Sequence, residues 1–316
     1  MRSGSWAVDG PDLDLVIVVV APGQGSQTPG FLAPWLELDG VRERLDAFGD
    51  AAQLDLVSLG TTADADAIRR TEVAQPLIVA AGLVAAAALD RPVTAVAGHS
   101  VGEVTAAVVS GVLGDADGMR LVATRGRAMA EAADAVPTGM SAVVGGDEQV
   151  VVARLEELGL TPANRNGGGQ IVAAGELPAL DALRTEPPAG ARVIPLQVAG
   201  AFHTRYMAPA VETLRAFAGG LSPTDPGARL WTNRDGSEVA SGAAFLDLLV
   251  GQVASPVRWD RCMESFADAG ITGLVELAPA GTLTGLAKRG LKGVPTVAVK
   301  TPADLAAAQA LLDGVA

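Results

Sequence analysis

The chain has 316 residues, of which 49% are hydrophobic and 3% aromatic, a length that suffices for a large domain carrying a smaller one. Its formal net charge of −13 repels nucleic acid phosphates and anionic lipid headgroups, so we expect neither a nucleic acid nor a membrane partner. The single cysteine, Cys262, cannot form an intramolecular disulfide. One cysteine and two histidines are too few for most structural metal sites, so we expect no metal.

The start of the chain carries no clear targeting signal. Residues 1–14 show no hydrophobic periodicity, which favours a disordered extension or a misassigned start. The apolar run at 15–21 is too short to span a membrane, and it leads into glycine-rich sequence instead of a cleavage site. We therefore expect a cytoplasmic protein.

Hydrophobic runs and turn residues predict alternating strands and helices in the first part of the chain. Residues 16–20 and 93–97 read as buried strands, and 75–89, 102–112 and 115–134 as helices. We expect Gly114 to close the second helix and Pro137 to follow the end of the third. With a core of small and β-branched residues, this order predicts an α/β fold with a parallel sheet.

The rhythm changes after residue 137. The segments 140–144, 147–158, 161–165, 170–174, 177–184 and 192–196 read as strand, helix, strand, strand, helix and strand, which is the ferredoxin-like order. We therefore place a ferredoxin-like small domain at 137–198, inserted into a large domain that comprises 1–136 and 199–316. Two later strands, at 273–277 and 296–299, belong to the large domain.

A nucleophile motif lies at Gly98-His99-Ser100-Val101-Gly102, which fits G-x-S-x-G between a predicted strand and a predicted helix. The glycines permit a sharp turn that exposes the Ser100 hydroxyl, and the N–H of Val101 lies where a helix begins, ready for a developing oxyanion. Such a motif also arises by chance, so the serine needs a base. His203 follows a predicted strand end and is the candidate, whereas the His99 side chain should project away from Ser100 and brace the turn.

The loop Gly23-Gln24-Gly25-Ser26-Gln27 follows the first predicted strand. It lacks the lysine ending of a phosphate loop and the spacing of a dinucleotide motif, which argues against nucleotide binding. Two other interpretations of this loop remain. It could be an ordinary turn, or the backbone N–H of Gln24 could be a second donor for the oxyanion, opposite the N–H of Val101.

Five motifs in order resemble the malonyl-CoA:acyl carrier protein transacylases, including the related acyltransferase domains of polyketide synthases. They are Gly23 to Gln27, Gly98 to Glu103, Thr124-Arg125-Gly126-Arg127-Ala128-Met129, Gly200-Ala201-Phe202-His203 and residues 251–259. The resemblance covers about Val18 to Thr301. It implies a hydrolase-like α/β domain with an inserted ferredoxin-like one, transfer of malonyl from coenzyme A to an acyl carrier protein, no cofactor, and a monomer.

The resemblance also implies residue roles. Ser100 would be the nucleophile, His203 the base, and the N–H groups of Gln24 and Val101 the oxyanion hole, while the backbone carbonyl of Gln252 would orient the histidine. Arg125 would bind the substrate carboxylate, for which a planar guanidinium is suited, with Arg127 on a solvated face instead. Phe202 should bound the same pocket, and His99 and Gln252 are assigned with it to substrate binding.

Two departures from the family pattern stand out. Arg165, in Asn164-Arg165-Asn166, replaces an apolar or aromatic residue, so it is a candidate for changing the pocket or a domain contact. Ala280 stands where glycine is usual and is expected to stiffen a turn.

Other functions are compatible with parts of the pattern. A serine esterase or thioesterase would share the turn at Ser100 but needs an acidic third residue, for which we find no candidate, and has no use for Arg125. A non-catalytic binding domain would not need the serine, histidine and arginine together. For an acidic carrier protein, Lys288, Arg289, Lys292 and Arg205 are the candidate docking patch, with scattered solvated charges as the alternative.

Overall fold

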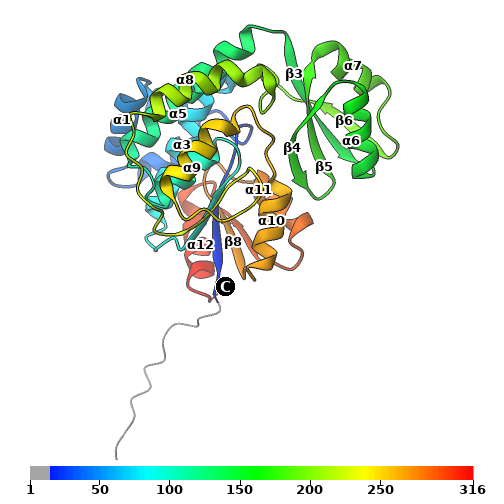
Figure 1. The fold of residues 1–316 in the computed structure, drawn as a ribbon. Coiled ribbons are helices and arrows are strands. Elements are labelled where there is room, and N and C mark those ends of the chain that lie inside the picture. The colour runs from blue at the N-terminus through cyan, green and yellow to red at the C-terminus, as the bar shows by residue number, and fades with distance from the viewer. Residues whose placement is uncertain (1–14, 316) are drawn as a thin grey trace, which may run out of the picture.

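The computed structural model describes residues 15–315, so the predictions for residues 1–14 lie outside the described part. Five parallel strands form the central sheet in the order β7-β2-β1-β8-β9 (Figure 1). β1, in the middle, is buried along its whole length, which is why its sequence is an uninterrupted apolar run. The strands are β1 (Ile17–Ala21), β2 (Ala95–Gly98), β7 (Arg229–Trp231), β8 (Gly273–Glu276) and β9 (Thr296–Ala298).

Helices cover both faces of this sheet, because alternate residues of β1 point to opposite sides. Ile17 and Val19 pack into a core with α1, α3 and α5, whereas Val18 and Val20 pack with α10 and α11. The helices are α1 (Val41–Ala52), α2 (Leu56–Thr61), α3 (Thr71–Ala88), α4 (Gly102–Val109), α5 (Asp115–Asp134), α8 (Ala208–Ala218), α9 (Gly242–Gln252), α10 (Trp259–Asp268), α11 (Thr282–Gly290) and α12 (Leu305–Leu312), with 3₁₀ turns η1 (Ala33–Glu37), η2 (Ala67–Arg69), η3 (Arg205–Met207) and η4 (Pro302–Asp304).

The α3 helix is the one helix in the described part of the chain that is long and apolar enough to cross a membrane. Its burial explains that composition, since 78% of its apolar window lies inside the protein. A helix that is apolar all round is what a position between other helices requires. The composition of α3 is therefore accounted for by its place in the core.

A second, antiparallel sheet has the order β4-β5-β3-β6 and lies beside the first (Figure 1). Two helices pack on it around a small core that contains Val143, Leu155 and Leu183. This sheet, together with the parallel one, confirms the predicted fold class; the boundaries at 137 and 198 remain a prediction. The elements are β3 (Thr138–Gly145), α6 (Glu148–Glu157), β4 (Thr161–Gly167), β5 (Gln170–Glu176), α7 (Leu177–Thr185) and β6 (Ala191–Pro195).

Two predicted details differ in the structure. The helix that begins at Gly102 ends at Val109, because Gly111 takes a φ of 84° and the chain turns there. Gly114 instead lies at the N-cap of α5. Ala280 has a φ of 52°, in the left-handed region that favours the glycine usual at this position.

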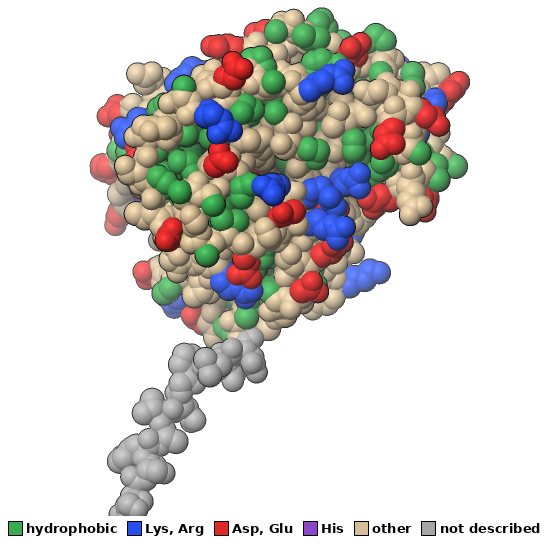
Figure 2. All heavy atoms as spheres, in the orientation of Figure 1, with side chains coloured by type: hydrophobic (Ala, Val, Ile, Leu, Met, Phe, Trp, Pro, Cys, Tyr) green, Lys and Arg blue, Asp and Glu red, His purple; other side chains and the backbone are tan. Residues whose placement is uncertain are grey.

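Positive side chains gather on one face although the molecule as a whole is acidic. Figure 2 shows Lys and Arg side chains grouped where α10 and α11 meet the small domain. Lys288 and Arg289 at the end of α11, and Lys292 after it, are exposed and make no ion pair within residues 15–315. Arg289 lies against the small domain, since a Cβ added to Gly168 would come within 2.9 Å of its Cβ.

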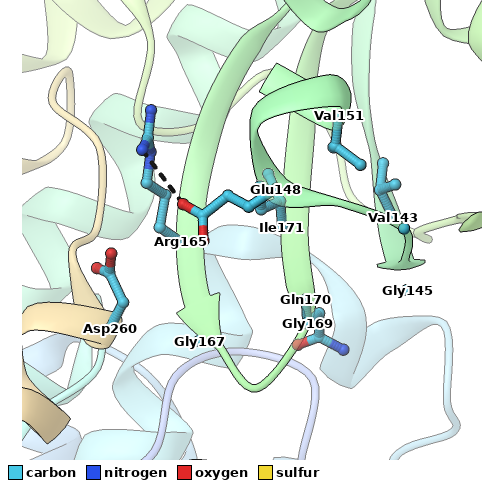
Figure 3. A pocket seen from close by; sticks show the side chains of 11 residues that line it. Val143, Gly145, Glu148, Val151, Arg165, Gly167, Gly169, Gln170, Ile171 and Asp260 are labelled. Carbon is cyan, nitrogen blue, oxygen red and sulfur yellow. Dashed lines mark hydrogen bonds and ion pairs between the residues drawn. The ribbon is translucent and has the colours of Figure 1, made fainter. Parts of the chain in front are cut away.

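Backbone hydrogen bonds join the small domain to the segment before α10. The N–H of Val257 donates to Ala163 O at 2.8 Å, and the N–H of Arg165 donates to Val257 O at 2.9 Å. The Arg165 side chain turns away and pairs with Glu148 at 3.4 Å, beside a cavity of ≈ 30 Å³ (Figure 3). Arg165 thus takes part in the domain contact through its backbone, while its side chain stays within the small domain.

Candidate active site

The turn between β2 and α4 holds Ser100 in a strained backbone conformation, with a φ of 54°. The flanking glycines are required by space. A Cβ on Gly98 would lie 2.0 Å from the carbonyl carbon of Gly102, and one on Gly102 would lie 2.2 Å from the carbonyl oxygen of Ala21. The tight packing of strand and helix therefore leaves Ser100 projecting from the turn, as a nucleophile elbow requires.

His203 lies against Ser100, with its Nε2 2.8 Å from the serine Oγ. The other ring nitrogen, Nδ1, donates to the backbone oxygen of Gln252 at 3.0 Å, which fixes the tautomer that leaves Nε2 free to accept. The backbone of His203 is held too, because its N–H donates to Val253 O at 3.0 Å and its φ is 61°. Both side chains are thus aligned for proton transfer.

Burial sets the charge of His203. Desolvation, followed by the nearby positive charge of Arg125, lowers the pKa of His203 to about 3. The imidazole is therefore neutral at physiological pH and able to act as a base. A carbonyl occupies the place of the acidic third residue of a hydrolase triad, which agrees with the absence of a sequence candidate for that residue.

Arg125, on α5, is 1% exposed and reaches the same point. Its Nη1 donates to Gln75 Oε1 at 2.7 Å, and its Nη2 donates to Gln252 Oε1 at 2.9 Å and lies 3.4 Å from Ser100 Oγ. Burial lowers the pKa of Arg125 to about 10, so the guanidinium stays charged at neutral pH. Arg127 is exposed, as predicted.

Glu103 and Asn233 complete this network, and sequence reasoning assigned neither a role. Glu103 Oε1 accepts from the N–H of Asn233 at 2.6 Å, and Oε2 accepts from Gln252 Nε2 at 2.7 Å. Asn233 in turn accepts from the N–H of Ser100 at 2.7 Å and donates to Gly98 O at 2.6 Å. The sequence does hold one signal that could have identified Glu103, which is its position directly after the G-x-S-x-G motif. Asn233 follows β7 and belongs to no motif, so the sequence offers no such signal for it.

A cavity of ≈ 280 Å³ opens onto Ser100 between the two domains. Phe202 lines it, together with Met140 and Val172 of the small domain. On the opposite wall, a Cβ added to Gly23 would lie 3.0 Å from His99 Nδ1, so the loop at 22–27 packs directly on the elbow. The lining combines apolar side chains such as Phe202 and Val172 with polar ones such as Asn164 and Gln170, so the cavity can hold an acyl group and also orient its polar atoms.

The backbone N–H groups of Gln24, which lines the cavity, and of Val101, which directly follows Ser100, have no partner in the described part of the chain. Within residues 15–315, the backbone N–H groups of Gln24 and Val101 donate no hydrogen bond. Gln24 is further anchored by its side chain, whose Nε2 donates to Arg69 O at 3.2 Å. Free N–H donors beside a nucleophile are what an oxyanion hole needs.

His99 points away from Ser100 towards the small domain. Its Nε2 lies 2.9 Å from Asn166 Oδ1, and its ring meets Trp259 edge-on at 5.6 Å between centroids. Burial lowers the pKa of His99, which keeps it neutral. His99 also lines the cavity, and its roles in bracing the elbow and in substrate binding remain predictions.

Within residues 15–315, no group of three or more His, Cys, Asp or Glu side chains is placed to hold a metal ion. Cys262 is fully buried among apolar side chains, and its Sγ also donates to Thr232 O at 3.4 Å. Burial raises its pKa well above the ordinary value, so the thiol stays protonated.

Comparison with known proteins adds sequence relatives along nearly the whole chain. Residues 18–307 match the family model described as acyl transferase domain. The chain is 54% identical to the malonyl CoA-acyl carrier protein transacylase of Mycobacterium tuberculosis strain H37Rv, covering 92% of this chain and 98% of that protein. It is 34% identical to the enzyme of the same name from Escherichia coli K12, covering 92% and 97%.

Solved structures agree. The crystal structure of MCAT from Mycobacterium tuberculosis superposes with a TM-score of 0.89 at 54% identity, covering 92% of this chain and 98% of that one. A type II PKS acyl-carrier protein in complex with its malonyl-transacylase is similar at a TM-score of 0.86 and 30% identity, covering 94% and 99%. The chain therefore belongs to the acyl transferase domain family and, within it, to the malonyl CoA-acyl carrier protein transacylases, which makes it an acyltransferase.

Proposed function

We propose that this protein transfers a malonyl group from coenzyme A to the phosphopantetheine thiol of an acyl carrier protein, through an ester on Ser100. The observation that carries the proposal is the placement of a neutral base 2.8 Å from Ser100 Oγ and of the buried Arg125 guanidinium 3.4 Å from it. The names of its relatives support the same donor and acceptor.

In the first half-reaction, His203 Nε2 takes the Ser100 proton while Oγ attacks the thioester carbonyl. The N–H groups of Gln24 and Val101 stabilise the oxyanion of the tetrahedral intermediate. The carbon–sulfur bond then breaks, the His203 imidazolium returns the proton to the coenzyme A sulfur, and a malonyl ester remains on Ser100.

The second half-reaction is the reverse with a different thiol. His203 takes the proton of the phosphopantetheine thiol, the sulfur attacks the ester carbonyl, and Ser100 leaves as a hydroxyl after recovering the proton. The reaction is a ping-pong exchange that needs no cofactor, since each half-reaction exchanges one acyl bond for another. Water must be kept from the ester for transfer to compete with hydrolysis.

Arg125 gives the selectivity for malonyl over acetyl. The two acyl groups differ by one carboxylate, which a guanidinium can bind in a bidentate manner. The desolvated setting strengthens this pairing for the malonyl group, and an acetyl group gains nothing from it.

The experiment is a two-step labelling of the purified protein with radioactive malonyl-CoA. Acid-stable label should appear on the peptide that contains Ser100 and should move to a carrier protein added afterwards. Ser100→Ala should show no label and retain the fold, because it removes one hydroxyl at a partly exposed turn. Label retained by Ser100→Ala, or label that passes only to water, contradicts the proposal.

A further inference from the structure

Arg125 and Glu103 are buried charges without a direct ionic partner. Each is 1% exposed. Within the described residues, 15–315, neither side chain makes an ion pair. Leaving a buried charge uncompensated is expensive, so each needs compensation from a group that is not in contact with it.

The side-chain amide of Gln252 joins the two charges. Arg125 donates to its Oε1 at 2.9 Å, and its Nε2 donates to Glu103 Oε2 at 2.7 Å. The amide can satisfy both neighbours only in this orientation, since the reverse would place the NH₂ group against the guanidinium and the oxygen against the carboxylate. The amide dipole is therefore aligned between the positive and the negative charge.

The second carboxylate oxygen of Glu103 fixes this arrangement to the elbow. It accepts from the N–H of Asn233, whose side chain holds the N–H of Ser100 and the carbonyl of Gly98. Glu103 follows Ser100 on the first turn of α4, so one rigid helix start carries both the nucleophile and the carboxylate. The position of the negative charge relative to Ser100 is thus set by the fold.

We propose that Glu103 is a positioning residue whose carboxylate, acting through the Gln252 amide, is the remote counter-charge of Arg125 and keeps the guanidinium open for a carboxylate on the substrate. This inference rests on the proposed function. A carboxylate in direct contact with Arg125 would neutralise it and occupy its donors. Glu103, one amide further away, balances the charge. One N–H of Nη2 donates to Gln252, and the other, beside Ser100 Oγ at 3.4 Å, is left for the substrate.

The test compares malonyl-CoA with acetyl-CoA as donors for wild type and Glu103→Gln. The introduced amide can accept from the Asn233 N–H, but its NH₂ group would then face Gln252 Nε2, and the Gln252 amide must turn its own NH₂ towards Arg125. We expect kcat/KM for malonyl-CoA to fall about tenfold or more, with acetyl transfer changed less than about threefold. Glu72→Gln is the control, because it removes a carboxylate on α3 that pairs with Arg70 instead.

The pH profile gives a readout that a merely structural role would not change. Burial raises the pKa of Glu103 to about 7. The groups that face it keep one charge state near that pH: Arg125 has a pKa of about 10, His203 one of about 3, and the pKa of Cys262 is raised well above its ordinary value. The malonyl-to-acetyl ratio of the wild type should therefore fall as the pH is lowered through about 7, and the ratio of Glu103→Gln should stay flat.

The two proposals fail differently. If Arg125→Ala removes the malonyl preference but the ratio is unaffected both by Glu103→Gln and by pH in the wild type, the role of Glu103 is overturned and the proposed function stands. If Arg125→Ala also leaves the ratio unchanged, the selectivity assigned to Arg125 fails together with the role of Glu103, while transfer through Ser100 is tested separately by the labelling experiment. Should Glu103→Gln not fold, the wild-type pH profile of the ratio decides the matter alone.

Discussion

Ser100 has two side-chain neighbours within reach of its hydroxyl, His203 at 2.8 Å and Arg125 at 3.4 Å. Both neighbours are buried, and burial disfavours the charged form of each. His203 becomes neutral because its pKa falls to about 3, whereas Arg125, with a pKa of about 10, keeps its charge. A neutral base and a fixed cation therefore act beside one nucleophile.

The low pKa of His203 predicts an unusual pH profile for acylation of Ser100. A base works only when unprotonated, so the rate should fall on acidification near pH 3 and not near the ordinary histidine value of about 6.5. The neutral ester 4-nitrophenyl acetate, with acylation followed by mass spectrometry, tests this with a substrate that has no carboxylate for Arg125 to bind. His203→Ala should lose a factor of about 10²–10⁴ and defines the background. An acid limb centred near 6.5 would contradict the neutral, buried imidazole.

Phe202 should limit the size of the acyl group. It lines the cavity beside Ser100 and is 6% exposed. Phe202→Ser should raise the ratio of methylmalonyl to malonyl transfer by about tenfold, since one buried carbon is worth about that much in selectivity. Phe217→Ser, on α8 and outside the cavity lining, should leave the ratio as it is. If wild type, Phe202→Ser and Phe217→Ser all show the same ratio of methylmalonyl to malonyl transfer, Phe202 does not contact the position of the methyl branch.

At the residue scale, sequence motifs anticipated which side chains meet, and the structure brings Ser100, His203 and Arg125 together. Their catalytic roles remain predictions. Glu103 and Asn233 were missed because their contact spans 130 positions and depends on where β7 lies in the sheet. For Gln252, only the backbone carbonyl was anticipated, whereas its side chain also joins Arg125 to Glu103.

The start of α4 packs so closely against β1 that only glycine fits at its first position. Gly102 admits no Cβ, since one would lie 2.2 Å from Ala21 O, while a Cβ on Gly285 of α11 would meet nothing within 4 Å. Gly102→Ala should therefore lower the free energy of unfolding by about 3 kcal/mol, and Gly285→Ala should raise it by about 0.5–1 kcal/mol. Urea unfolding of both variants measures this. Two variants of equal stability would mean that the elbow relaxes around the added methyl group.

At the element scale, periodicity predicted the order of the elements in the segments it addressed, at 16–20, 75–134, 273–277 and 296–299 and in the antiparallel unit at 140–196. It did not predict α1, α2, β7, α8, α9, α10, α11 or α12. Helix ends were harder. Gly111 and Gly114 are both plausible C-terminal glycines in the sequence, and only the positive φ of Gly111 distinguishes them. The strand order β7-β2-β1-β8-β9 could not be predicted either, because it depends on pairings between segments far apart in the chain.

For the whole molecule, charge distribution matters more than net charge. Lys288, on α11, is exposed and unpaired within residues 15–315, and Leu286 of the same helix lines the cavity. Lys288→Glu should raise KM for carrier protein about three- to tenfold at low salt and leave labelling by malonyl-CoA unchanged. Arg42→Glu on α1 is the matched control, with the same change in charge. If both variants give the same KM, the patch has no part in docking.

The composition predicts that the molecule repels nucleic acids and anionic lipids, because the net charge of −13 follows directly from the sequence. It could not predict the grouping of cations beside the small domain (Figure 2). This grouping arises because α10 and α11 lie next to that domain (Figure 1), with Arg289 of α11 against Gly168.

The central claim, that a buried arginine beside Ser100 selects malonyl, is tested most directly by Arg125→Ala. The variant leaves the malonyl carboxylate without a partner in a desolvated pocket, whereas acetyl has no carboxylate to compensate. Transfer from malonyl-CoA and from acetyl-CoA is measured for wild type, Arg125→Ala and the exposed-site control Arg127→Ala. We expect Arg125→Ala to lose malonyl transfer by a factor of about 10²–10³ while acetyl transfer holds or rises. An equal loss for both donors would contradict the claim, because it would make Arg125 a structural residue.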